Sequence, residues 1–262
     1  MPIADLAGLP VHYEDSRGDG PAVLFSHGFF MDSSMFDPQV AALAPDHRCI
    51  RWDERGFGRT PAPLPFTLWD AAEDAIELLD HLDVEEAVFV GMSQGGYLSL
   101  RAALVDPDRV RALVLIDTAA DLDGPDAVAG YEAMFGVLRN GAEEEREAVL
   151  AGVAGMLLGE ERLYPTWIPR WRAIDPDDLG NAAGALLERD DVSERLGEIE
   201  CPALVVHGAA DRAISIDRAE ALARGLPGCR GLVRVDGAAH APNLSHPDVV
   251  NRALAGFLDS LD

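Results

Sequence analysis

Short apolar segments recur along the chain, and each is bounded by Gly, Pro, Asp or His. They cover residues 22–25, 49–52, 87–90, 113–116, 203–206 and 232–235. Runs of this length, rich in β-branched residues and nearly free of charge, are typical of strands buried on both faces, as in a parallel sheet. The segment 10–14, followed by the turn residues Gly18, Asp19 and Gly20, predicts an antiparallel strand ahead of them.

Between these segments the spacing of apolar residues changes to that of amphipathic helices. In residues 68–82, Leu68, Ala72, Ile76 and Leu79 fall on one face, and acidic residues occupy the others. Residues 94–105, 217–223 and 247–258 show a similar pattern. Strands that alternate with helices imply right-handed crossovers, so the sequence predicts an α/β protein whose mostly parallel sheet is flanked by helices.

The alternation stops between residues 121 and 199. This stretch has no convincing strand, and its pattern predicts helices at 126–138, 142–158 and 179–189. The connections between these helices contain Tyr164, Trp167, Ile168 and Trp171. A long helical insertion between two strands of one sheet must lie outside the sheet. We therefore expect a core made of residues 1–120 and 200–262, with residues 121–199 forming a helical cap.

The chain of 262 residues carries 46 acidic and 21 basic residues, all of the latter Arg, for a net charge of −25. This excess repels nucleic acid and anionic membranes, so neither is expected as a partner. Solubility explains it more simply than salt adaptation or the steering of cationic ligands. No uncharged run is long enough to span a bilayer, and the N-terminus lacks a basic signal region. With an odd number of cysteines and no CxxC spacing, the expected location is cytoplasmic.

The sequence Gly91-Met92-Ser93-Gln94-Gly95 lies where a buried strand gives way to a helix. Gly-x-Ser-x-Gly in this context places the serine on a sharp turn, and the glycines leave room for it. The hydroxyl then lies at the carboxyl edge of the sheet, where open α/β sheets bind ligands, and at a helix N-terminus. A phosphate-binding turn, the alternative, needs a lysine that this chain lacks. Ser93 is therefore the predicted nucleophile.

A serine hydroxyl needs a base to take its proton, and the base needs a carboxylate to hold its tautomer. His240 lies in a loop of small residues after the last predicted strand, and Asp211 follows the strand before it. The order Ser, acid, His is the one that this topology requires. Two alternatives remain open. Asp117, at the end of segment 113–116, could be the acid, and Asp211 could instead cap the helix that opens near Ser215.

Acyl transfer also needs donors directed at the tetrahedral oxyanion. The predicted donors are the backbone N–H groups of Phe29, after the segment 22–25, and of Gln94, after the nucleophile. His27, in the same loop as Phe29, is predicted to be structural. The pocket is expected to be apolar, with packing inside the cap as the alternative role of its side chains. Its predicted residues are Phe30, Met92, Trp167 and Trp171.

The segment 52–60 is predicted to be a structural turn, in which glycines allow tight bends and an ion pair between Asp53 and Arg55 could hold the loop. The sequence has no HExxH motif and no Cys/His cluster, so no metal site is predicted. No cofactor is expected either.

Five motifs occur together in one order: residues 27–29, 53–60, 91–96, 207–211 and 237–240. With them the chain resembles the α/β-hydrolase superfamily along its full length. It is similar to the capped branch of carboxylesterases, enol-lactone hydrolases, cofactor-free haloperoxidases and C–C bond hydrolases. The resemblance implies an eight-stranded, mostly parallel sheet with the cap inserted after the sixth strand. The family usually has Ser where Thr60 stands and an apolar residue where Glu54 stands, and its branches with an aspartate nucleophile do not fit Ser93.

The leading functional prediction is hydrolysis of a small carboxylic ester or lactone through an acyl-enzyme. One alternative is C–C cleavage of a diketo acid, for which Arg162, Arg170 or Arg172 could bind the anionic substrate. Perhydrolase or haloperoxidase activity is another, and a ligand-binding protein that uses the fold without turnover is a third. The expected partner is the small-molecule substrate, and the sequence leaves open whether the chain forms a homo-oligomer.

Overall fold

The computed structural model describes residues 2–261, which contain one sheet of eight strands. Across the sheet the order is β1-β2-β4-β3-β5-β6-β7-β8. Neighbouring strands from β4 across to β8 are parallel, and β1 and β2 are antiparallel additions at one edge. The predicted fold class is confirmed. The strands are Ile3–Leu6 (β1), Leu9–Asp15 (β2), Ala22–Ser26 (β3), Arg48–Trp52 (β4), Ala87–Met92 (β5), Val110–Ile116 (β6), Ala203–Gly208 (β7) and Cys229–Val235 (β8).

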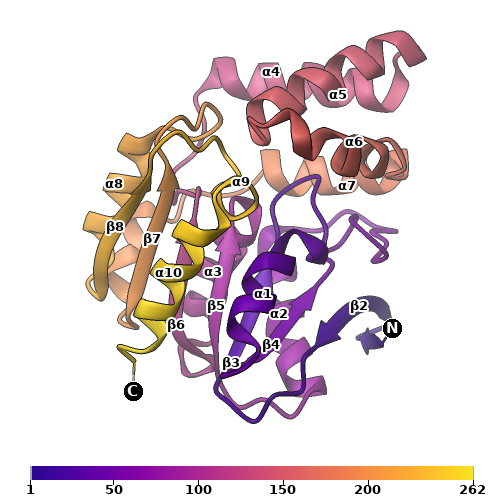
Figure 1. Cartoon of the computed structure of the whole chain (residues 1–262). Coiled ribbons are helices and arrows are strands. Elements are labelled where there is room, and N and C mark those ends of the chain that lie inside the picture. Colours follow the sequence, from indigo (N-terminus) through magenta and orange to yellow (C-terminus); the bar gives the residue numbers. More distant parts are fainter. Residues whose placement is uncertain (1, 262) are drawn as a thin grey trace.

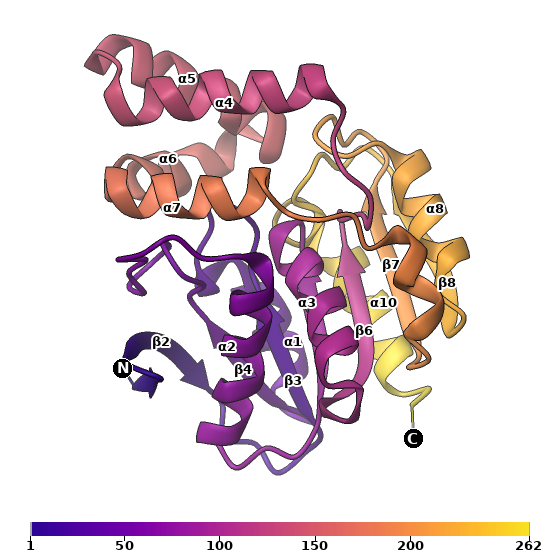
Figure 2. The ribbon, with the colours of Figure 1, turned by 180° about the vertical axis from the view of Figure 1, so that it is seen from behind.

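Helices cover both faces of the sheet (Figures 1 and 2). On one face, α1 (Asp37–Leu43) packs against α10 (Pro247–Leu258). The other face carries α2 (Leu68–His81), α3 (Gln94–Val105) and α8 (Ile216–Gly225). The central strand β5 is buried at every position, which is why its sequence contains no polar side chain. Short helical turns lie at Ser33–Phe36 (η1), Pro107–Arg109 (η2), Glu161–Leu163 (η3), Ser193–Glu198 (η4) and Pro242–Ser245 (α9).

Four helices, α4 (Pro125–Asn140), α5 (Glu143–Leu157), α6 (Tyr164–Arg172) and α7 (Pro176–Leu187), come between β6 and β7 in the chain. They form a layer above the carboxyl ends of the parallel strands (Figure 1). This is where residues 121–199 were expected to lie, while their standing as a separate unit stays a prediction. Within residues 2–261, no helix is long and apolar enough to cross a membrane.

Apart from the short helical turns, three elements, β1, α1 and α6, lie outside the sequence predictions. β1 is only four residues long, too short for its alternation to be distinctive. α6 occupies a segment that the sequence indicates as a connection, because Pro165 in its first turn and Pro169 inside it disguise the helical pattern. Trp167 and Trp171, one turn apart, are nevertheless buried on the same face of α6.

Candidate active site

Ser93 lies at the turn between β5 and α3 with backbone angles φ 51° and ψ −112°. This left-handed φ is strained for a residue with a side chain, and close backbone packing maintains it. A Cβ atom at Gly91 would lie 2.2 Å from the carbonyl oxygen of Gly95, and one at Gly95 would lie 2.0 Å from that of Ser26. Neither contact is physically possible, so both motif glycines are required by the approach of neighbouring backbone.

Hydrogen bonds fix this turn to the neighbouring strands. The N–H of Ser93 donates to the carbonyl of Ile116, at the end of β6, at 2.8 Å. The N–H of Gly95 donates to the carbonyl of His27, just beyond β3, at 2.9 Å. The hydroxyl of Thr118 donates to the carbonyl of Ser93 at 2.8 Å. The ends of β3, β5 and β6 therefore hold the serine at the carboxyl edge of the sheet.

The structure brings Ser93, His240 and Asp211 together. His240 Nε2 lies 2.9 Å from Ser93 Oγ, and His240 Nδ1 lies 2.7 Å from Asp211 Oδ2. The imidazole comes from the loop after β8 and the carboxylate from the loop after β7. Because the carboxylate can only accept, Nδ1 carries the proton of the ring and Nε2 is free to accept the proton of the hydroxyl. This is the arrangement in which an imidazole can act as a general base.

The second oxygen of Asp211 is also occupied. Its Oδ1 accepts hydrogen bonds from the N–H groups of Ala213 at 2.8 Å and Ile214 at 3.2 Å. Burial by itself would raise the pKa of Asp211, but the charge and hydrogen bond of His240, with the surrounding donors, lower it to about 2. Asp211 is therefore an ionised, fully hydrogen-bonded carboxylate at every pH of enzymatic interest.

Asp117, the alternative acid, lies behind Asp211 and makes no hydrogen bond to His240 within the described residues. Its side chain is fully buried, and it accepts the N–H of Gly208 at 2.9 Å. Burial, together with the neighbouring charge of Asp211, raises the pKa of Asp117 well above the usual range of a carboxyl group. Asp117 is thus a neutral acid that donates a hydrogen bond to Asp211, which is the carboxylate in contact with the imidazole.

Asp117, Asp211 and His240 are also the one group of acidic and imidazole side chains within residues 2–261 that is close enough to share a metal ion. Their polar atoms are engaged with one another and with Ser93, so the donor set forms a chain of hydrogen bonds. Such a chain suits proton transfer, and it leaves no convergent set of free ligand atoms.

The two predicted oxyanion donors come from different segments of the chain. Gln94 is the first residue of α3, so its N–H has no partner within the helix, and Phe29 lies in the loop after β3. Across residues 2–261, neither N–H donates a hydrogen bond to another group of the protein. Phe29 lines the same cavity as Ser93 and His240. Both groups are therefore available to a bound oxyanion, and this role stays a prediction.

The cavity beside Ser93 has a volume of about 60 Å³ and is mainly apolar. Phe30 and Met92 line it as predicted, but Trp167 and Trp171 do not. Trp171 instead packs against the ring of Phe30, with centroids 5.7 Å apart, and Trp167 lies beneath the guanidinium of Arg170. Both tryptophans are buried packing residues, and the contact of Trp171 with Phe30 joins the cap helix α6 to the loop after β3.

Sequence reasoning missed the cap residues that do line this cavity. Tyr131, Met134 and Phe135 come from α4, and Met156 comes from α5. Their positions within predicted helices were clear from the sequence, but which helix face turns toward the serine depends on how the cap sits on the sheet. No local pattern carries that information.

Two structural predictions for the neighbouring loops have different outcomes. His27 is fully buried, with Nδ1 donating to the carbonyl of Gly28 and Nε2 accepting the N–H of Glu54 at 2.9 Å, as expected of a structural residue. The ion pair expected between Asp53 and Arg55 is wrong. Arg55 pairs with the buried carboxylate of Asp74 at 2.8 Å, because this side chain projects from the adjacent helix α2.

Asp53 instead stabilises the loop through its own network. Its carboxylate accepts the N–H of Ser33 at 2.8 Å, the N–H of Arg59 at 3.0 Å and Nδ1–H of His12 at 3.0 Å. Burial would raise the pKa of Asp53, but His27 and these donors lower it on balance. Asp53 is thus an ionised acceptor that connects three segments of the chain.

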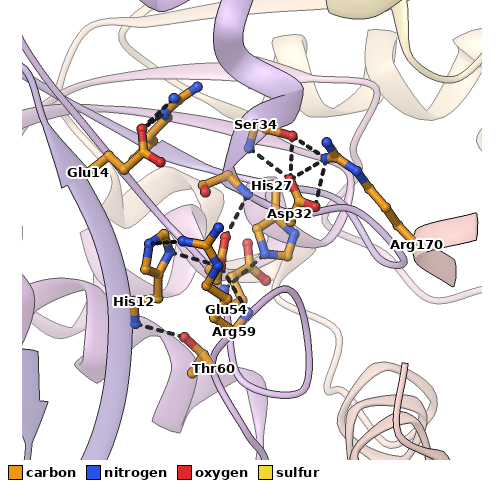
Figure 3. A network of polar contacts seen from close by, with 12 residues as sticks. His12, Glu14, His27, Asp32, Ser34, Glu54, Arg59, Thr60 and Arg170 are labelled. Atoms are coloured by element: carbon orange, nitrogen blue, oxygen red, sulfur yellow. Dashed lines mark hydrogen bonds and ion pairs between the residues drawn. The ribbon is translucent and has the colours of Figure 1, made fainter. Parts of the chain in front are cut away.

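A larger cleft, of about 520 Å³, lies on the other side of Phe30 and contains no member of the triad. Figure 3 shows the polar network at its wall, where Arg170 pairs with Asp32 at 2.9 Å and Arg59 contacts His12 at 3.1 Å. The smaller cavity is the one beside which a hydroxyl and an imidazole are within hydrogen-bonding distance.

Residues 21–247, most of the chain, match the family described as the α/β hydrolase fold. The chain therefore belongs to the α/β hydrolase fold family, as its sheet order and its serine turn indicate.

Individual relatives share nearly the whole chain. It is 31% identical to a protein of Agrobacterium fabrum provisionally named carbamate hydrolase RutD, over 95% of this chain and 98% of that protein. It is 28% identical to the 3-oxoadipate enol-lactonase 1 of Acinetobacter baylyi, over 93% of this chain and 90% of that enzyme. The crystal structure of the enol-lactonase from Burkholderia xenovorans is similar with a TM-score of 0.87, at 27% identity, covering 98% of this chain and 100% of that one. These names support a hydrolytic enzyme without fixing the bond that it cleaves.

Proposed function

We propose that the protein is a serine hydrolase that cleaves a small carboxylic ester or lactone through an acyl-enzyme. The observation that carries the proposal is the continuous hydrogen-bond chain from Ser93 Oγ through His240 to Asp211, at the wall of an apolar cavity. The order of the groups, hydroxyl to imidazole to carboxylate, is the one that nucleophilic attack by a serine requires.

In the first step, His240 Nε2 accepts the proton of Ser93 Oγ as this oxygen attacks the acyl carbon. Asp211 stabilises the imidazolium that forms, and the N–H groups of Phe29 and Gln94 donate to the oxyanion. His240 then donates its proton to the leaving alkoxide, which for a lactone remains attached to the acyl chain. In the second step, His240 Nε2 takes a proton from a water molecule, whose oxygen attacks the acyl carbon. The bond between this carbon and Ser93 Oγ then breaks, His240 returns the proton to Ser93 Oγ, and the acid is released.

The cavity favours a short, uncharged acyl group. It is small, with a volume of about 60 Å³, and aromatic and aliphatic side chains form most of its wall. The carboxylate at its wall, Asp123, is already paired with Arg189 at 2.7 Å and with Arg218 at 2.6 Å. None of the described lining residues is an arginine, so an anionic diketo acid would find no cation there.

The three arginines considered as anchors for such a substrate all form ion pairs with carboxylates outside the cavity. Arg162 pairs with Glu160, Arg170 pairs with Asp32, and Arg172 pairs with Glu147 at 2.6 Å. None of the three lines the cavity beside Ser93. Ester or lactone cleavage is therefore better supported than C–C cleavage.

A carbamate is a second candidate substrate, because a relative that is 31% identical over nearly the full chain carries that name. A carbamate presents the same kind of acyl carbonyl to Ser93, and the same triad could cleave it. Haloperoxidase-like chemistry would use the same acyl-enzyme with peroxide as the second nucleophile, so one set of assays separates these alternatives.

The test is a panel of short-chain aryl esters, lactones, aryl carbamates and a diketo acid, assayed with the purified wild type and with Ser93→Ala. We expect ester or lactone turnover that falls at least about 10⁴-fold in Ser93→Ala. Mass spectrometry with a slow substrate should show the acyl group on the peptide that contains Ser93. Hydrogen peroxide added to the same reaction tests for a peracid product.

Ser193→Ala is the matched control, because Ser193 is an exposed serine of the turn η4. Its activity should equal that of the wild type. Equal ester hydrolysis by wild type and Ser93→Ala would reject Ser93 as the nucleophile. Turnover of the carbamate or the diketo acid alone would reject the proposed substrate class while leaving the triad in place.

A further inference from the structure

Glu54 is a buried acidic residue at a position where the family usually has an apolar one. It lies in the loop after β4, and its side chain is almost completely buried. Its backbone N–H donates to His27 Nε2 at 2.9 Å, so Glu54 is attached to the loop that also carries Phe29 (Figure 3). The carboxyl group therefore lies in the protein interior next to the predicted oxyanion hole.

The side chain of Glu54 contacts the amide of Gln94, whose backbone N–H is the second predicted oxyanion donor. Gln94 Nε2 donates to Glu54 Oε2 at 2.7 Å, and both side chains are buried. The remaining oxygens, Glu54 Oε1 and Gln94 Oε1, are also buried, and neither has a hydrogen-bond partner within the described residues. Two unsatisfied buried acceptors in one contacting pair are costly and need an explanation.

A protonated Glu54 would supply a donor for Gln94 Oε1, and two hydrogen bonds instead of one would then join the carboxylic acid to the carboxamide. We propose that Glu54 is held as a neutral carboxylic acid in this two-bond pair, and that the pair positions the oxyanion-hole N–H of Gln94. Glu54 is thus a positioning residue, and its effect on catalysis rests on the hydrolase function proposed above.

The groups that face Glu54 agree with a neutral acid near neutral pH. Burial raises its pKa to about 7, with the negative charges of Asp53 and Asp74 adding to the rise and His27 and Gln94 opposing it. His27 opposes the rise only when its ring is protonated, whereas its hydrogen bonds, one donated and one accepted, are those of the neutral ring. Asp53 and Asp74 have their own donors, as described above.

Ionisation of Glu54 would weaken catalysis in two ways. The hydrogen bond to Gln94 Oε1 would be lost, and a negative charge would appear in the interior near the place where the oxyanion forms. Both effects act on the transition state more than on a neutral substrate. The rate of the wild type should therefore fall on the alkaline side with a midpoint near pH 7, mainly in kcat.

The decisive variant is Glu54→Gln, because an amide has a donor where the acid has its O–H and does not titrate. With a neutral ester, we expect kcat at pH 6 within about threefold of the wild type, and kcat at pH 9 at least about tenfold higher. Glu54→Leu fills the space but leaves the amide of Gln94 without its partner. We expect it to lower kcat by about tenfold or more at both pH values.

A spectroscopic measurement makes the test independent of activity. Infrared difference spectra of the wild type between pH 6 and pH 9 should show the loss of a neutral carboxylic acid C=O band, which Glu54→Gln abolishes. An unchanged alkaline limb in Glu54→Gln, or the absence of that band, would overturn the proposal. If Ser93→Ala kept full activity, the hydrolase function would fail while the infrared result on Glu54 still stood.

Discussion

Replacing Asp211 by Asn tests the direction of the hydrogen bonds at the triad. In the wild type, Oδ1 of Asp211 accepts the N–H groups of Ala213 and Ile214, and Oδ2 faces Nδ1 of His240 at 2.7 Å. An asparagine can satisfy the two N–H groups only with its oxygen, so its NH₂ group must face His240. The ring then keeps its proton on Nε2 and has no lone pair for the hydroxyl of Ser93.

The expected loss follows from this change of tautomer. When geometry is preserved and only the tautomer is wrong, kcat falls by about 10⁴, which is about 5.4 kcal/mol of transition-state stabilisation. The loss should appear in kcat and leave KM nearly unchanged, because the lining of the cavity beside Ser93 does not include Asp211.

Asp117→Asn is the matched variant, since it makes the same isosteric change in the neighbouring carboxyl group. Because Asp117 is neutral, its asparagine can still accept the N–H of Gly208 and donate to Asp211. We expect less than about a tenfold loss of kcat, the value of one altered hydrogen bond. Steady-state assays of both variants with a short-chain aryl ester, with folding checked by circular dichroism, decide the matter. An equal loss in the two variants, or a loss below tenfold in Asp211→Asn, would refute the reasoning.

Three further outcomes are expected. Gly95→Ala should lose about 3 kcal/mol or more of stability in urea melts, because its Cβ would meet the carbonyl of Ser26. Gly136→Ala, in open space on α4, should be neutral or gain up to about 1 kcal/mol. Equal effects of the two substitutions would contradict the packing argument. Folding raises the pKa of Glu54 from 4.5 to about 7, so the stabilising contribution of Glu54 is present below pH 4.5 and is lost as the pH rises through 7. Glu54→Gln should therefore be more stable than the wild type by about 3 kcal/mol at pH 8. No gain in stability at that pH would count against a buried titrating acid. Phe135→Ala should enlarge the cavity and raise the relative kcat/KM for longer acyl chains, and an unchanged chain-length profile would place the acyl group elsewhere.

The sequence by itself determined the architecture, and it indicated Ser93 and His240 as reacting groups, with Asp211 or Asp117 as the acid. Short, nearly uncharged runs bounded by turn residues predict buried strands, and their alternation with amphipathic helices predicts a parallel sheet. In such a sheet all carboxyl ends meet at one edge, so residues that follow β5, β7 and β8 must come close together. This is why Ser93, Asp211 and His240, far apart in the chain, were predictable as a group.

Where the sequence offered two side chains of the same chemistry for one contact, only the tertiary structure decided which of them makes it. Asp117 and Asp211 both follow strands at the same edge, and only the loop geometry shows that Asp211 reaches His240. The face of α4 that turns toward the serine, and the proton on Glu54, likewise depend on neighbours that are distant in sequence. The physical reason is that the periodicity of a sequence depends on which residues are buried and on whether the backbone is helical or extended. The hydrogen-bond partner and the charge state of a side chain depend instead on short distances between segments that only folding brings together.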